Sequence, residues 1–248
     1  SGGTLARYDG STWSTETSGT ASAIRGIDGF LYNTWAVGSG GTILRHNGTT
    51  WSASTSGTTT ILSEVYQYDS NSTWAVGFSG TLLYHDGTSW STQSSGVSVH
   101  LSDVWAVSSN DVWVAGDSGT LLNYDGTSWS SVSSGTTSSL KGLYRSSGIP
   151  PSQSKLWAVG MSGTILQYDG TSWATQTSNT SSHLYKIDGS SDSDVWAVGY
   201  RGTIVHHDGT SWTPLAPVNG EYLYDVWAAS SSDVWVVGGH GLVLHITK

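Results

Sequence analysis

The chain has 248 residues, long enough for one well-buried core, and it carries 9 lysines and arginines against 18 aspartates and glutamates. The net charge of −9 opposes binding to nucleic acid, whose phosphates require clustered cations, and to anionic membranes. Cysteine is absent, which excludes disulfides and thiolate metal sites, and no apolar run approaches the roughly 18 residues of a membrane span.

A repeat runs along the whole chain, and its clearest copy is D-V-W-A-V-G-Y-R-G-T-I-V-H-H-D-G-T-S-W at residues 194–212. The copies lie 39 residues apart, except for one interval of 44 that marks an insertion at residues 146–153. Their anchors are Trp35, Trp74, Trp113, Trp157, Trp196 and Trp235. A second series repeats in step, namely Trp13, Trp51, Trp90, Trp129, Trp173 and Trp212. A period near 40 is typical of a propeller blade.

Each copy contains short runs of alternating apolar and polar residues bounded by Gly, Asp and Ser, which is typical of strands and turns. We expect four strands per copy, exemplified by L-x-x-V-W-A, V-W-A-V-G, G-T-I-L-x-Y and a run that begins at Trp-Ser. No stretch has a helical pattern. The sequence therefore predicts an all-β, six-bladed β-propeller of four-stranded antiparallel blades, forming a single domain over residues 1–248.

The two ends of the chain carry one strand more than six blades of four require. The third-strand pattern occurs seven times and the others six times, which gives 25 strands. We expect the last blade to take three strands from residues 223–246 and its outer strand from residues 13–17, so that N- and C-terminal strands close it. The surplus strand, residues 3–8, either stays within its own chain or pairs with a neighbouring molecule, giving self-association.

At these residues the chain resembles the tectonin-type repeat, whose blades combine Leu-x-x-(Val/Ile), Val-Trp-x-Val and Gly-x-Ile-x-x-x-Asp-Gly-x-x-Trp. All six copies carry most of that pattern, so the similarity covers nearly the whole length. Tectonin propellers are lectins that bind bacterial surface sugars or lipopolysaccharide. The resemblance therefore implies a propeller that binds carbohydrate.

Most of the conspicuous polar residues have a structural interpretation. Five aspartates precede Gly in tight turns, and three histidines share a repeat position with tyrosines, which indicates packing. No nucleophile motif such as Gly-x-Ser-x-Gly occurs, so we expect no enzyme activity and no cofactor. Asp103, Asp225 and Glu64 share a position on the first strand, where they could face the central channel and bind a cation, an alternative that stays open.

Candidate binding residues lie at the two positions before the third-strand Gly-Thr, where the residue varies among copies of the repeat. Variable positions on a rigid frame are typical of binding surfaces, although exposed loops also vary freely. The candidates are Phe78, Asp117, Met161, Tyr200, Arg201 and His240. We expect the aromatic faces to stack on sugar C–H groups, and the charged side chains to hydrogen-bond hydroxyls.

The sequence thus predicts a non-catalytic, lectin-like propeller without a bound metal that recognises a glycan or cell-surface polysaccharide. Its composition, rich in Ser, Thr and Gly and poor in Lys, is typical of a bacterial protein that is secreted or held at the cell surface. The alternative is a structural or protein-interaction subunit that assembles through its surplus terminal strand.

Overall fold

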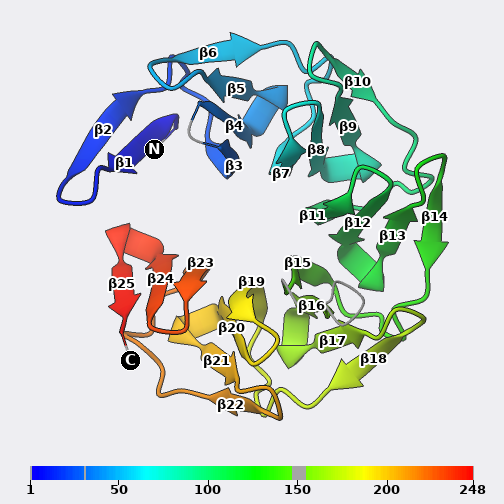
Figure 1. Ribbon diagram of the computed structural model, residues 1–248, viewed down its shortest axis with the longest axis vertical. Coiled ribbons are helices and arrows are strands. Elements are labelled where there is room, and N and C mark those ends of the chain that lie inside the picture. The colour runs from blue at the N-terminus through cyan, green and yellow to red at the C-terminus, as the bar shows by residue number, and fades with distance from the viewer. Residues whose placement is uncertain (1, 31, 147–154, 248) are drawn as a thin grey trace. The chain divides into compact units, whose positions relative to one another are not determined.

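The structure is a computed structural model that describes residues 2–30, 32–146 and 155–247. It confirms a six-bladed all-β propeller built from four-stranded antiparallel blades (Figure 1). Five sheets have all four strands in sequential order, and they are β3–β6, β7–β10, β11–β14, β15–β18 and β19–β22. Residues 147–153 of the predicted insertion at residues 146–153 lie outside the described residues.

The strand bounds follow the predicted pattern in every repeat. The first two sheets comprise β3 (Ile24–Phe30), β4 (Asn33–Gly38), β5 (Ile43–His46), β6 (Trp51–Ser54), β7 (Leu62–Asp69), β8 (Ser72–Gly77), β9 (Leu82–His85) and β10 (Trp90–Thr92). The third and fourth comprise β11 (Leu101–Ser108), β12 (Asp111–Gly116), β13 (Leu121–Tyr124), β14 (Trp129–Val132), β15 (Leu140–Arg145), β16 (Leu156–Gly160), β17 (Ile165–Tyr168) and β18 (Trp173–Gln176). The fifth comprises β19 (Leu184–Ser191), β20 (Asp194–Gly199), β21 (Ile204–His207) and β22 (Trp212–Pro214).

The chain ends form two smaller sheets. The strands β1 (Thr4–Tyr8) and β2 (Trp13–Thr17) pair with each other, and β23 (Leu223–Ser230), β24 (Asp233–Gly238) and β25 (Val243–Ile246) form a three-stranded sheet. The blade predicted to combine both ends is thus present as two separate sheets. The local turn at residues 9–12 favours this pairing, because β2 reaches β1 with little loss of chain entropy.

Contacts between Cα atoms group the described residues into two compact units. The first comprises residues 1–114 and 122–130, and the second comprises residues 115–121 and 131–248. Each unit has its own buried clusters, made of second-strand tryptophans and the aliphatic residues around them. In the first unit, Trp35 and Trp74 are at most 2% exposed and pack edge-to-face on Trp90 and Trp129 of the following blade. These tryptophans therefore pack consecutive blades together.

A shift in register re-aims one side chain at the start of the first strand in several blades. In the fifth sheet, Leu184 pairs with Gly199 and Lys186 with Val198, so that Tyr185 stands at a bulge. The same shift occurs between Leu223 and Asp225, which leaves Tyr224 at the bulge of β23. Bulges turn side chains out of the regular alternation, and here they affect tyrosines beside the predicted binding loops.

The helices of the described residues are single turns of 3-10 helix between the second and third strands. Their bounds are η1 (Ser39–Gly41), η2 (Phe78–Gly80), η3 (Asp117–Gly119), η5 (Met161–Gly163), η6 (Tyr200–Gly202) and η7 (Gly239–Gly241). No helix in the described part of the chain is long and apolar enough to span a membrane.

Candidate functional site: a tyrosine cluster beside the 3-10 turns

Each 3-10 turn holds the two variable residues in one fixed backbone conformation. In η1, η2, η5, η6 and η7, the backbone N–H of the first residue donates to the carbonyl of the residue before the first strand, as from Tyr200 to His183 at 2.9 Å. The second residue is left-handed in every blade, whether it is Gly40 (φ 66°), Arg201 (φ 53°) or His240 (φ 54°). The variable side chains therefore project from a backbone that does not vary.

Two of the predicted site residues make close contacts with the next blade along the chain. The ring of Phe78 is 38% exposed and stacks on His100, with centroids 4.0 Å apart, and His100 lies 2.7 Å from the hydroxyl of Ser63. The carboxylate of Asp117 forms an ion pair with Lys141 at 2.6 Å. These contacts connect the turns η2 and η3 to the start of the first strand in the next blade. One face of the Phe78 ring and the carboxylate of Asp117 are therefore already engaged within the protein.

The turn η5 is linked to the following blade through its second residue. Met161 is partly buried, and the backbone N–H of Ser162 donates to His183 Nδ1 at 2.9 Å. The ring of His183 lies 5.7 Å from that of Tyr200. This histidine thus connects the loop of Met161 to the aromatic residues of the fifth blade.

The second unit carries a group of four exposed or partly exposed tyrosines, which we call the tyrosine cluster. Its members are Tyr185, Tyr200, Tyr222 and Tyr224. Tyr200 and Tyr222 are stacked with centroids 5.2 Å apart, and Tyr224 meets Tyr222 edge-on at 6.4 Å. Tyr222 is 42% exposed and Tyr224 is 55% exposed. The cluster therefore presents several ring surfaces side by side to solvent.

The electrostatics of the cluster follow from its packing. Burial raises the pKa of Tyr185, and the neighbouring cluster tyrosines raise it further, so the Tyr185 phenol is a neutral donor at physiological pH. The guanidinium of Arg201 lies over the Tyr200 ring, 5.2 Å from its centroid. His240 is hydrogen-bonded to Glu221 at 2.9 Å, directly before Tyr222 in sequence. The structure thus brings Tyr200 and Arg201 together and ties His240 to the segment that carries Tyr222.

Four residues of this site were not among the sequence candidates, namely His183, Tyr185, Tyr222 and Tyr224. They flank the first-strand leucine, at positions that vary among the blades. In the fourth blade, for example, the same two positions are Ser139 and Lys141. Extending the comparison of repeats to the start of the first strand would have identified them.

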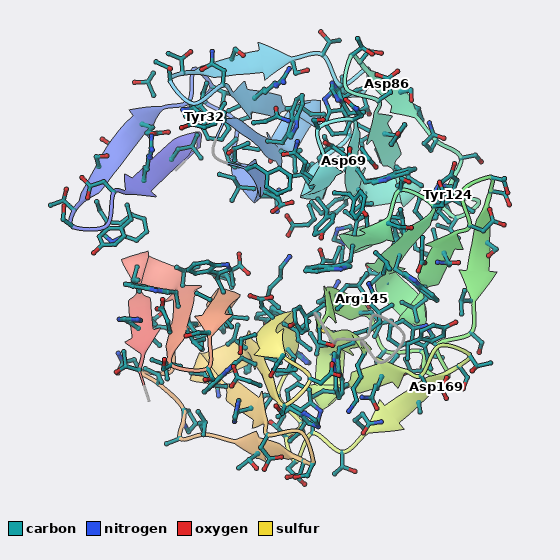
Figure 2. All side chains as sticks on the ribbon, in the orientation of Figure 1. Tyr32, Asp69, Asp86, Tyr124, Arg145 and Asp169 are labelled. Atoms are coloured by element: carbon teal, nitrogen blue, oxygen red, sulfur yellow. The ribbon has the colours of Figure 1, made fainter. Side chains whose placement is uncertain are left out.

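The residues assigned to the scaffold behave as predicted, and Figure 2 labels one of them, Asp86. Asp86 Oδ1 accepts the backbone N–H groups of Thr88 and Ser89 at 2.8 and 2.9 Å, and a hydrogen bond from the Thr88 hydroxyl is the main cause that lowers the Asp86 pKa. His85 packs between Trp35 and Trp90, with ring centroids 4.7 and 5.2 Å away, and burial lowers its pKa. The turn role of the aspartate and the packing role of the histidine are confirmed.

The carboxylates considered for a cation are bonded locally. Glu64, Asp103 and Asp225 each accept the backbone N–H of the following residue, at 3.1, 2.9 and 2.9 Å. In the ranges that the structure describes, no group of three His, Cys, Asp or Glu side chains could hold a metal ion.

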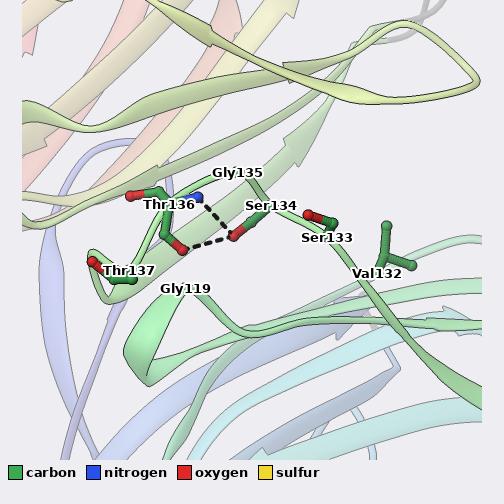
Figure 3. A pocket seen from close by; sticks show the side chains of 7 residues that line it. All are labelled: Gly119, Val132, Ser133, Ser134, Gly135, Thr136 and Thr137. Carbon is green, nitrogen blue, oxygen red and sulfur yellow. Dashed lines mark hydrogen bonds between the residues drawn. The ribbon is translucent and has the colours of Figure 1, made fainter.

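Shallow hollows recur beside the Ser-Gly-Thr loops that follow the fourth strand. One is lined by Gly119 and residues 132–137 (Figure 3), and a related hollow in the first unit is lined by Gly80 and residues 93–99. The Ser134 hydroxyl donates to the carbonyl of Thr136 at 3.1 Å and accepts its N–H at 3.3 Å. The Ser134 hydroxyl is therefore already hydrogen-bonded within its own turn.

Known proteins share the fold of this chain at low sequence identity. No protein-family profile matches the sequence, and no curated protein matches it. The solved structure of YCF48 bound to D1 peptide superposes with a TM-score of 0.72 at 20% identity, covering 92% of this chain and 79% of that one. YCF48 from Cyanidioschyzon merolae gives a TM-score of 0.54 at 17% identity, covering 91% and 96%. The chain is therefore similar in fold to YCF48 propellers.

Proposed function

We propose that this chain is a non-catalytic protein-interaction propeller that binds a segment of a partner polypeptide at the tyrosine cluster. The observation that carries this proposal is the packing of the partly exposed Tyr200 against the exposed Tyr222 and Tyr224, beside the guanidinium of Arg201. Tyr, Trp and Arg are the residues enriched where protein interfaces derive most of their affinity.

The chemistry of the cluster suits a polypeptide ligand. Tyrosine offers a large apolar face at a small cost in side-chain entropy, and its hydroxyl bonds to backbone carbonyl or N–H groups. Tyr200 and Tyr222 hold each other in place, so little ordering is required on binding. Similarity of fold to a YCF48 that is bound to a peptide supports the same class of ligand.

A surface glycan is the second candidate ligand, and it retains the lectin prediction. The exposed tyrosine faces are also suited to sugar C–H groups, and the hollows beside the Ser-Gly-Thr loops are rich in hydroxyls. The internal bonds of Ser134 and its counterpart Ser95 make those hollows the weaker candidate. Tectonin-like membership and a bacterial, secreted or surface location stay predictions.

One experiment separates the two ligand classes. The immobilised chain is presented with a random-peptide display library and with a glycan array, and the double variant Tyr222→Ala, Tyr224→Ala is treated in the same way. We expect peptide enrichment that the double variant loses, while Tyr32→Ala, a control at a 77% exposed tyrosine outside the cluster (Figure 2), keeps it. Glycan binding without peptide enrichment would overturn the proposal in favour of a lectin.

Two further predictions accompany the proposal. A panel of chromogenic glycosides should stay uncleaved, since no nucleophile motif occurs in the chain.

Self-association through the surplus strand is tested by light scattering of the full chain against a chain that lacks residues 1–8. A monomer in both cases would exclude it.

A further inference from the structure

Asn47 occupies a position where the other five hairpin turns have aspartate. Those residues are Asp9, Asp86, Asp125, Asp169 and Asp208. Asn47 lies between β5 and β6, and its side-chain Oδ1 accepts the backbone N–H groups of Thr49 and Thr50, both at 3.0 Å. Two donors on one carbonyl oxygen polarise the amide and stabilise negative charge that develops on that oxygen.

The next residue, Gly48, has its backbone nitrogen in contact with a histidine. The N–H of Gly48 donates to Nδ1 of His46 at 3.2 Å. The His46 ring is 6% exposed and packs on Trp51, with centroids 5.0 Å apart, so its position is fixed. An unprotonated imidazole nitrogen at this distance is placed to remove the proton from the Gly48 nitrogen.

We propose that Asn47 is a self-modification site, at which the folded turn converts the asparagine side chain to a carboxylate. The Gly48 nitrogen attacks Cγ of Asn47 while His46 accepts its proton, and the new N–Cγ bond closes a succinimide ring. The Cγ–Nδ2 bond breaks, and ammonia leaves with the transferred proton. Water then opens the ring and leaves aspartate or isoaspartate at position 47.

The fold is already suited to the aspartate product. In the matching turn of the next blade, Asp86 Oδ1 accepts the N–H groups of Thr88 and Ser89 at 2.8 and 2.9 Å, the same arrangement that Asn47 has. Conversion would give all six turns an acidic residue and change the net charge from −9 to −10. Carboxylates accept such bonds more strongly than amides do, so the aspartate form should be the more stable protein.

Comparison with the other turns explains why Asn47 alone is the reactive position among the six. His85 and His207 contact the N–H groups of Gly87 and Gly209 in the same way, each at 3.1 Å. The intervening residues there are Asp86 and Asp208, and an ionised carboxylate is a poor electrophile. Asn47 alone combines an amide, a following glycine and a histidine acceptor among these turns.

The test follows deamidation of the full-length protein over time in neutral buffer by peptide mapping and mass spectrometry. Asn219 is the internal reference, because it is exposed and is also followed by glycine. We expect Asn47 to convert at least about tenfold faster than Asn219, and His46→Tyr to slow Asn47 about tenfold without affecting Asn219. Tyrosine occupies the matching position in three other turns, at Tyr8, Tyr124 and Tyr168, so the variant preserves the packing.

A second measurement does not depend on any variant. The same time course is run on the wild-type chain in concentrated urea, where the contacts of His46, Thr49 and Thr50 are lost. Faster conversion of Asn47 in the folded protein supports the proposal. Faster conversion in urea, an unchanged amide while Asn219 converts, or an equal rate in His46→Tyr would overturn it.

Discussion

Arg201 combines a constrained backbone with an exposed side chain. Its φ of 53° is left-handed, a conformation that costs an L residue about 1 to 2 kcal/mol, and three other blades place serine there with the same geometry. We expect Arg201→Ser to leave the free energy of unfolding within about 0.5 kcal/mol of wild type. Peptide affinity should fall severalfold, because the cation over Tyr200 is lost. Thermal denaturation and a peptide titration check both parts, and unchanged affinity would remove Arg201 from the site.

Asp188 gives the protein a pH dependence of unusual sign. Its Oδ2 accepts the Ala228 N–H at 2.8 Å, and burial raises its pKa from 3.8 to about 6. The folded state therefore holds this proton more tightly than the unfolded state, and the Asp188 contribution to stability falls as pH rises from about 4 to 6.

We expect Asp188→Asn to flatten the loss of stability in that window, because asparagine keeps the acceptor oxygen and has no proton to lose. Denaturant unfolding at a series of pH values measures the slope. Asp125→Asn is the contrasting control, since hydrogen bonds led by the one from Thr127 lower the Asp125 pKa and the preceding residue is Tyr124 rather than histidine. That variant should lose stability above pH 4 and retain it at lower pH. Parallel pH profiles for wild type and Asp188→Asn would contradict the account.

At the scale of elements, the 3-10 turns depend on a glycine at their third position. In η2, Gly80 has φ 70°, and a Cβ there would lie 1.9 Å from the carbonyl oxygen of Val97. Gly96 has almost the same φ of 72°, but nothing lies within 4 Å of its Cβ position. We expect Gly96→Ala to cost about 1 kcal/mol and Gly80→Ala at least about 3 kcal/mol in unfolding free energy. Similar costs in urea denaturation would show that the contact does not constrain the turn.

Most of this architecture could be predicted from the sequence, because the repeat samples each element several times. The two tryptophan series, to which Trp35 and Trp90 belong, predicted where the strands lie. The Asp-Gly turns predicted the hairpins between third and fourth strands. The site was harder to predict. The variable turns of the site could be identified, but the residues that they contact lie in the following blade. The repeat pattern also does not reveal the bulge that takes Tyr224 out of the regular alternation of β23. The pairing of β2 with β1 could not be predicted either, because the pattern alone does not decide whether β2 pairs with β1 or with the C-terminal strands.

At the scale of the whole molecule, a repeated scaffold carries positions that differ in each blade. The buried tryptophans and turn aspartates recur in most copies of the repeat, whereas the residues of the 3-10 turns and beside the first-strand leucine vary among the blades. With a net charge of −9 and few lysines, the chain offers little electrostatic attraction to acidic partners. Recognition through stacked tyrosines is therefore the mode of binding that its surface chemistry favours.

The central claim is that the tyrosine cluster binds a polypeptide, and a calorimetric titration with a peptide selected from the display library tests it most directly. The account predicts saturable binding to the full chain that weakens at least about tenfold in Tyr222→Ala, Tyr224→Ala and stays unchanged in Tyr32→Ala. Equal affinity for the double variant and the wild-type protein would contradict it.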